Sequence, residues 1–135
     1  MTRSGYSDDP DSNWAIIIWR GAVASALKGK RGQAFLKEML AAFDALETKR
    51  LVANELQQEG EVCALGAVGL RRGLDMERLD PEDYDTVAST FAIAGAMARE
   101  IMYENDESGV YNETPEQRYM RMRRWVEIHI VKESA

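Results

Sequence analysis

The segment from Gln33 to Thr48 constrains the fold more than any other part of this sequence. Apolar residues recur in it at helical spacing, and polar residues fill the opposite side. The apolar positions are Phe35, Leu36, Met39, Leu40, Phe43 and Leu46. This pattern follows the 3.6-residue period of an α-helix and gives the helix one apolar face that must be covered. We therefore predict a helix here, packed against neighbouring elements.

The segment from Trp14 to Leu27 is apolar on nearly every side of a helical wheel. Such a helix is typical of the buried centre of a domain, so we predict a central helix that begins near Ser12 or Asn13. The β-branched residues 16–18 would also suit a strand, but the Ala-rich continuation and the length favour a helix. Because the link at Gly29–Gly32 is short, we expect an antiparallel pair with the next helix.

Helix-start signals recur in the second half of the chain. Asp80 followed by Pro81 predicts a helix that runs to about Phe91, and another helix is expected from about Ala94. Thr114 precedes a proline and stands three positions before a glutamine, which is the capping-box pattern of a last helix. Residues 51–68 leave two alternatives open, a short helix notched by glycines or a β-hairpin.

These patterns together predict a mainly α fold, a compact bundle of about five or six helices with at most one short β-hairpin. Residues 13–135 are expected to form a single helical domain, and residues 1–12 a flexible N-terminal arm without apolar periodicity. The residues expected in the core are Phe35, Leu36, Met39, Leu40, Phe43, Met97, Ile101 and Trp125.

Charge and reactive residues narrow the function classes. The 23 acidic and 17 basic residues give a net charge of −6, which repels phosphate backbones and disfavours nucleic acid as a partner. The chain has one histidine, His129, and one cysteine, Cys63, which lies in an apolar run. We therefore expect no enzyme activity, no metal and no cofactor. The longest apolar run is far short of the roughly 20 residues of a membrane span, so we expect a cytoplasmic protein.

Two basic clusters are the candidate partner-binding residues. Lys30 and Arg31 lie between two glycines where a helix is expected to start, and this corner could contact a partner or an anion, or form a solvated turn. Arg118, Arg121 and Arg124 follow one side of the last predicted helix, close to two aromatic residues. Arginine beside aromatic residues is typical of interfaces, but ion pairing with the acid-rich segment 80–113 is an equal alternative.

A helix-turn-helix in residues 81–103 is the alternative functional reading. Ala88 suits the small position of the first helix, although Ala92 stands where glycine is usual. The reading face would present Ala94, Ala96 and Arg99, which offers one side chain suited to base edges. A packed helical corner explains the same pattern without DNA.

Several segments resemble a family of small proteins of unknown function carried by bacteriophages and prophages. The similar segments are 13–23, 29–36, 61–68, 103–107 and 114–116. The resemblance implies an accessory protein that binds a host or phage protein in the host cytoplasm, and such proteins include inhibitors of host defence systems. It transfers no functional residue, and it leaves a homodimer open.

Overall fold

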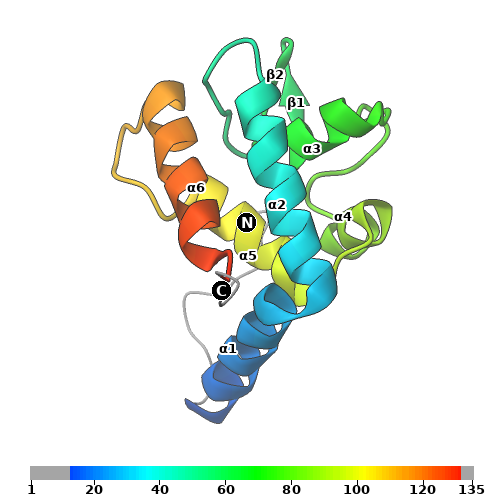
Figure 1. The fold of residues 1–135 in the computed structure, drawn as a ribbon, viewed down its shortest axis with the longest axis vertical. Helices are drawn as coiled ribbons and strands as arrows, with labels where there is room; N and C mark the ends of the chain where they lie inside the picture. Colours follow the sequence, from blue (N-terminus) through cyan, green and yellow to red (C-terminus); the bar gives the residue numbers. More distant parts are fainter. Residues whose placement is uncertain (1–12, 132–135) are drawn as a thin grey trace.

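The structure is a computed structural model that describes the backbone of residues 13–131 and the side chains of residues 20–131 (Figure 1). Within this range the chain is mainly helical, with six helices and one two-stranded antiparallel hairpin, so the predicted fold class is confirmed. The predicted arm, residues 1–12, lies outside the described residues. The elements are α1 (Asn13–Lys28), α2 (Lys30–Ala45), β1 (Gln57–Gln58), β2 (Glu61–Val62), α3 (Ala64–Arg72), α4 (Tyr84–Phe91), α5 (Gly95–Asp106) and α6 (Pro115–His129).

The centre of the fold is formed by α5 and α2. α5 packs against α1, α3, α4 and α6, and α2 packs against α1, α3 and α6. Figure 1 shows α5 crossing behind α2. Of the predicted core residues, Leu40 and Trp125 are only partly buried. The other six are buried in one continuous core: Phe35, Leu36, Met39, Phe43, Met97 and Ile101.

The arrangement of α1 differs from the prediction of a central helix in an antiparallel pair. Figure 1 shows α1 leading away from the other helices, and α2 running on from it instead of folding back. In residues 20–28 only Val23 and Leu27 are buried. The reason is the link, which is Gly29 alone. A helical hairpin needs about two to five connecting residues, so one residue cannot reverse the chain. The side chains of residues 13–19 lie outside the described part.

The ambiguous stretch between α2 and α4 contains both predicted alternatives. The β1–β2 hairpin pairs Gln57 with Val62, and α3 follows at once. Gly66 lets α3 pack directly on the hairpin, since a Cβ at this position would clash with the carbonyl oxygen of Leu56. Gly66, one of the glycines expected to notch the helix, is therefore the point at which α3 contacts the hairpin.

Replacing Gly66 with alanine is expected to lower the free energy of unfolding by about 1–3 kcal/mol, because the obstructing atom belongs to the backbone and cannot move aside cheaply. Urea unfolding measures the loss. Gly21→Ala is the matched control: Gly21 is also helical, but nothing lies within 4 Å of its virtual Cβ. That variant should be neutral or slightly more stable. Equal effects of the two substitutions would contradict the packing of α3 on the hairpin.

Helix capping explains where α4 and α6 begin. α4 starts at Tyr84, later than predicted, because Asp83 is the N-cap and its carboxylate accepts from the Thr86 N–H. The Asp80 carboxylate instead accepts from the Glu82 N–H, which holds a turn before the helix. The predicted capping box of α6 is confirmed, since Thr114 Oγ1 accepts from the Gln117 N–H and the Thr114 N–H donates to Gln117 Oε1.

Candidate functional site

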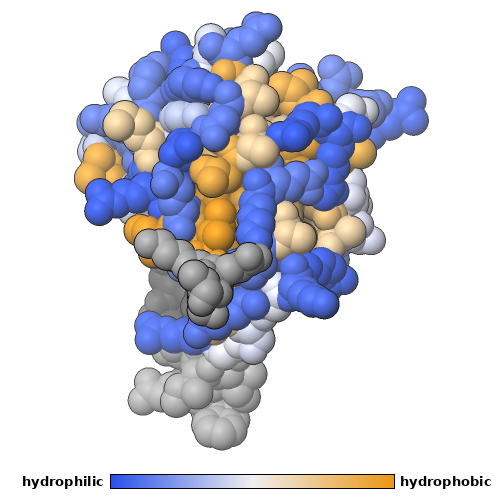
Figure 2. Space-filling model, in the orientation of Figure 1, coloured by the Kyte–Doolittle hydropathy of each residue, from blue (hydrophilic) through white to orange (hydrophobic). Residues whose placement is uncertain are grey.

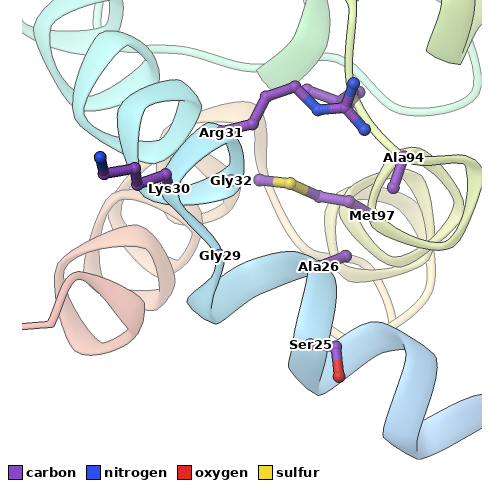
Figure 3. A pocket seen from close by; sticks show the side chains of 9 residues that line it. Ser25, Ala26, Gly29, Lys30, Arg31, Gly32, Ala94 and Met97 are labelled. Atoms are coloured by element: carbon purple, nitrogen blue, oxygen red, sulfur yellow. The ribbon is translucent and has the colours of Figure 1, made fainter.

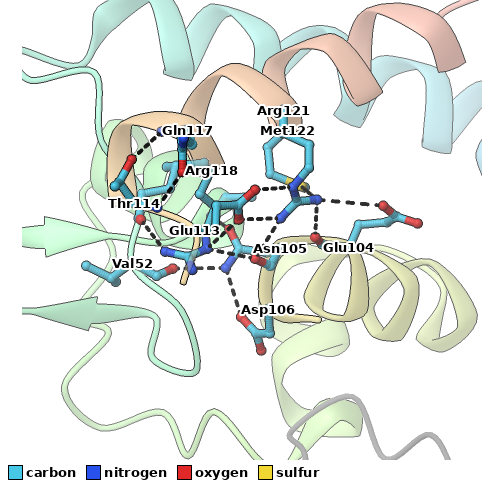
Figure 4. Close-up of polar contacts among 12 residues, drawn as sticks. Val52, Glu104, Asn105, Asp106, Glu113, Thr114, Gln117, Arg118, Arg121 and Met122 are labelled. Atoms are coloured by element: carbon cyan, nitrogen blue, oxygen red, sulfur yellow. Dashed lines mark hydrogen bonds and ion pairs between the residues drawn. The ribbon is translucent and has the colours of Figure 1, made fainter. Parts of the chain in front are cut away.

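The loop between α5 and α6 is fixed by a buried carboxylate, that of Glu113. Its side chain is only 6% exposed, and Arg121 donates to both of its oxygens, at 2.7 and 3.0 Å. Arg118 approaches the same carboxylate at 3.3 Å. Figure 4 shows both arginines reaching from α6 to this group. Bidentate, charge-assisted pairing of this kind fixes position as well as charge.

The same two arginines satisfy carbonyl groups at the end of α5. Arg121 Nη1 donates to the Glu104 carbonyl at 2.6 Å, and Arg118 Nε donates to the Asn105 carbonyl at 3.0 Å. Arg118 Nη1 also reaches the Leu51 carbonyl at 3.1 Å. The last carbonyls of a helix lack intrahelical partners and attract cations. The two side chains therefore join α6, the end of α5 and the segment before the hairpin.

Electrostatics keep Glu113 ionised at neutral pH. The hydrogen bonds from Arg121 are the largest cause and lower the pKa of this carboxyl from its ordinary value of 4.5. Burial acts in the opposite direction, and the charges of Arg121 and Arg118 lower the pKa further. The carboxylate is thus a charged anchor for the loop.

Asn105, which is fully buried, completes this anchor. Its Oδ1 accepts from the Ala64 N–H at 3.1 Å, at the start of α3. Its Nδ2 donates to the Val52 carbonyl at 2.9 Å and to the Asp106 carboxylate at 2.8 Å. A buried amide with both ends satisfied holds its surroundings in one arrangement.

The loop presents two apolar residues at its tip. The Glu113 N–H donates to the Val110 carbonyl at 3.1 Å and closes the turn, in which Asn112 has a φ of 63°. A Cβ on Gly109 would clash with the Glu113 carboxylate, so the loop packs tightly on its anchor. Val110 is 71% exposed and Tyr111 is 93% exposed. We call these two residues the 110–111 tip.

Two of the three arginines predicted as a partner surface are used within the chain. Arg118 and Arg121 hold Glu113, whereas Arg124 is exposed and has no ion pair among the described residues. Arg124 lies on the outer face of α6 with Met120 and Ile128, which are 71% and 67% exposed. Arg118 and Arg121 therefore form an internal anchor, whereas Arg124 lies on an exposed surface.

The other predicted partner residues, Lys30 and Arg31, meet the start of α5 at a small pocket. Its volume is about 220 Å³. Figure 3 shows Arg31 extending toward the side formed by Ala94, whereas Lys30 points away. The lining residues are Ser25, Ala26, Gly29, Lys30, Arg31, Gly32, Ile93, Ala94 and Met97.

The two helices of the predicted helix-turn-helix are present as α4 and α5, joined by residues 92–94. Ala92, between α4 and α5, adopts the left-handed conformation with φ 57° and ψ 44°, where glycine is usual. α5 is unsuited to a DNA groove, however, because every residue from Gly95 to Asp106 is buried or half-buried. Ala94 and Ala96 are half-buried too, and the Arg99 guanidinium lies 4.5 Å from the centre of the Tyr84 ring. A reading helix needs an exposed face for base edges.

The remaining reactive side chains have structural contacts. The buried Cys63 thiol accepts from the Gly66 N–H and caps α3. The His129 ring lies 4.6 Å from the Trp125 ring, and its Nδ1 is 2.7 Å from the Trp125 carbonyl oxygen. The described residues contain no group of three His, Cys, Asp or Glu side chains placed to hold a metal ion. No helix in residues 13–131 has the length and apolar character needed to cross a membrane.

Comparison of the chain with known protein families, with curated protein sequences and with solved structures gives no match.

Proposed function

We propose that this protein acts by binding another protein, and that the 110–111 tip is the centre of the contact. The observation that carries the proposal is Tyr111, which is 93% exposed on a turn. Tyrosine is enriched among the residues that contribute most to interface affinity. Its neighbour Val110 adds apolar area that is also exposed.

The rigidity of the loop is the second support. Binding costs less when a contact residue is already held in its bound position. Here the Glu113 carboxylate, its two arginines and the turn at Asn112 hold the backbone behind the tip.

The outer face of α6 supplies further contact area. A standard interface buries about 800 Å² on each partner, which is more than two residues can provide. Figure 1 places the loop beside the N-terminal end of α6, and Figure 2 shows apolar patches among hydrophilic side chains along this edge. Met120, Arg124 and Ile128 are exposed on this helix. An arginine between apolar residues is chemistry that interface surfaces favour.

The sequence resemblance supplies the biological setting of the proposal. We infer a phage-type accessory protein whose partner is a host or phage protein, with an inhibitor of a host defence protein as the candidate role. The net charge of −6 also favours a protein partner over nucleic acid.

Replacing Tyr111 with alanine is expected to lower the amount of partner captured from bacterial host lysate at least about tenfold, as for a central contact residue. The measurement is quantitative mass spectrometry on protein captured by the tagged chain. Leu70→Ala is the matched control, because Leu70 is an exposed apolar residue, 51% accessible, on α3. Equal capture by the wild type and the Tyr111 variant would overturn the proposal.

A DNA-binding regulator is the second candidate, favoured by the left-handed turn at Ala92. The burial of α5 and the stacking of Arg99 on Tyr84 weigh against it. A gel shift at low salt with random and upstream DNA separates the two functions. A shift that is lost on Arg99→Ala would support the regulator, and the absence of any shift would remove it.

A further inference from the structure

A second surface, independent of the 110–111 tip, lies at the pocket between α1, α2 and α5. Its interior is apolar, formed by Ala26, Ile93 and Met97. Ile93 and Met97 are 6% and 1% exposed, so the pocket has a firm floor. The volume of about 220 Å³ is below the range of about 300–1,000 Å³ usual for cofactor and small-molecule sites. It suits one side chain of a partner.

The rim of the pocket carries the exposed, cationic side chain of Arg31. Arg31 extends along it toward Ala94, whereas the Lys30 side chain points away, as Figure 3 shows. Neither has an ion-pair partner among the described residues, although the chain is acidic overall. Six other arginines of the described chain do pair with acids, whereas Arg124 does not: Arg50, Arg72, Arg78, Arg118, Arg121 and Arg123 are the paired ones. An acidic group of a partner would therefore be electrostatically complementary to this rim.

The starts of two helices add positive potential to the same pocket. The N-caps Gly29 of α2 and Ala94 of α5 both line it, and neither provides a side-chain hydrogen bond to its helix. Neither helix carries an acid in its first turn. The N-terminus of a helix carries roughly half a positive charge. The end of α1, which contributes Ser25 and Ala26 to the same pocket, carries the opposite partial charge, but the two helix starts together outweigh it and add to the preference that Arg31 sets.

We propose that this pocket receives an acidic segment of a partner protein, with an apolar side chain on the floor and an adjacent carboxylate against Arg31. An apolar floor favours a protein segment over a phosphate backbone, which has no apolar group to bury. The net charge of −6 also opposes the approach of a long polyanion. The proposal concerns a different surface from the 110–111 tip and stands whether or not the tip binds a protein.

The test is an amide-resolved NMR titration of the full chain with the blocked peptide acetyl-Glu-Val-Asp-Val-amide. The expected result is a saturable shift of the backbone amides of residues 30–32 and 94–96. The neutral peptide acetyl-Gln-Val-Asn-Val-amide should leave them unmoved. Arg31→Glu should weaken the acidic peptide at least about tenfold, as loss and reversal of a complementary charge does.

Lys37→Glu is the matched control, since Lys37 is an exposed cation of α2 that does not line the pocket and has no ion pair among the described residues. It should bind the acidic peptide as the wild type does. Equal weakening by the two reversals would overturn the proposal, as would equal shifts with the neutral peptide. Equal shifts with inorganic phosphate, or stronger shifts with a short DNA duplex, would also overturn it. In the spectrum of each free variant, unchanged chemical shifts of backbone amides far from the substituted residue verify that the variant is folded.

Discussion

Replacing Glu113 with alanine is expected to lower the free energy of unfolding by about 2–4 kcal/mol. The substitution leaves Arg118 and Arg121 without their shared acid, at side-chain exposures of 13% and 24%. Removal of one partner of a fully buried ion pair costs about 3–5 kcal/mol. The estimate is lower here because Arg121 keeps some contact with water and both arginines retain their bonds to carbonyl groups.

Urea unfolding at pH 7 measures this loss, and Glu116→Ala is its control. The Glu116 side chain is 55% exposed and pairs with Arg50 at the surface, where an ion pair contributes at most about 1 kcal/mol. If Glu113→Ala lost no more than Glu116→Ala, the Glu113 carboxylate would not be the anchor of the loop.

Acidification should reduce the contribution of the Glu113 carboxylate to the free energy of unfolding. Because folding lowers the pKa of this carboxyl below 4.5, its stabilisation is complete above that pH. It declines as the pH falls from 4.5 through the folded-state pKa. The difference in unfolding free energy between the wild type and Glu113→Ala should therefore be constant near neutral pH and shrink in acid.

Replacing Phe43 with alanine is expected to cost about 3–5 kcal/mol, the usual range for an emptied aromatic site in a core. Phe43 has no exposed surface, and its ring lies 5.8 Å from the ring of Tyr119 on α6. The Tyr119 hydroxyl also donates to the Phe43 carbonyl at 3.1 Å. The substitution would thus loosen the contact between α2 and α6.

Chemical denaturation of Phe43→Ala gives the measurement, with Tyr111→Ala as the control for loss of an aromatic side chain. The exposed Tyr111 should change stability by no more than about 0.5 kcal/mol. A loss below about 1 kcal/mol at Phe43 would contradict its place in the core.

The sequence predicted those helices whose position is set by a single local signal. The Thr114 capping box predicted the start of α6. The period of apolar residues predicted α2, but the helix covers Lys30–Ala45 and so begins and ends about three residues before the predicted bounds. The position of α1 was predicted wrongly because it depends on a link of one residue. The period of apolar residues does not reveal the length of a link between helices. The start of α4 was missed because two aspartates compete for one cap, and the contacts around Thr86 decide for Asp83.

Less of the candidate site could be predicted from the sequence. Helical spacing placed Arg118 and Arg121 on one side of α6, but it did not reveal that Glu113, from the preceding loop, lies against them. The tip did leave a signal, since Val110 and Tyr111 are apolar or aromatic residues within a polar stretch. The exposure of that pair follows from the anchor behind it, which only the three-dimensional arrangement reveals.

A photo-crosslinking residue placed at position 111 tests the central claim most directly. With p-benzoylphenylalanine in place of Tyr111, irradiation in host cells should yield a covalent adduct with one specific protein, and excess wild-type chain should suppress it. The same residue in place of Leu70, which is exposed on α3, should yield no such adduct. No adduct at position 111, or the same adducts at both positions, would contradict a partner contact at the tip.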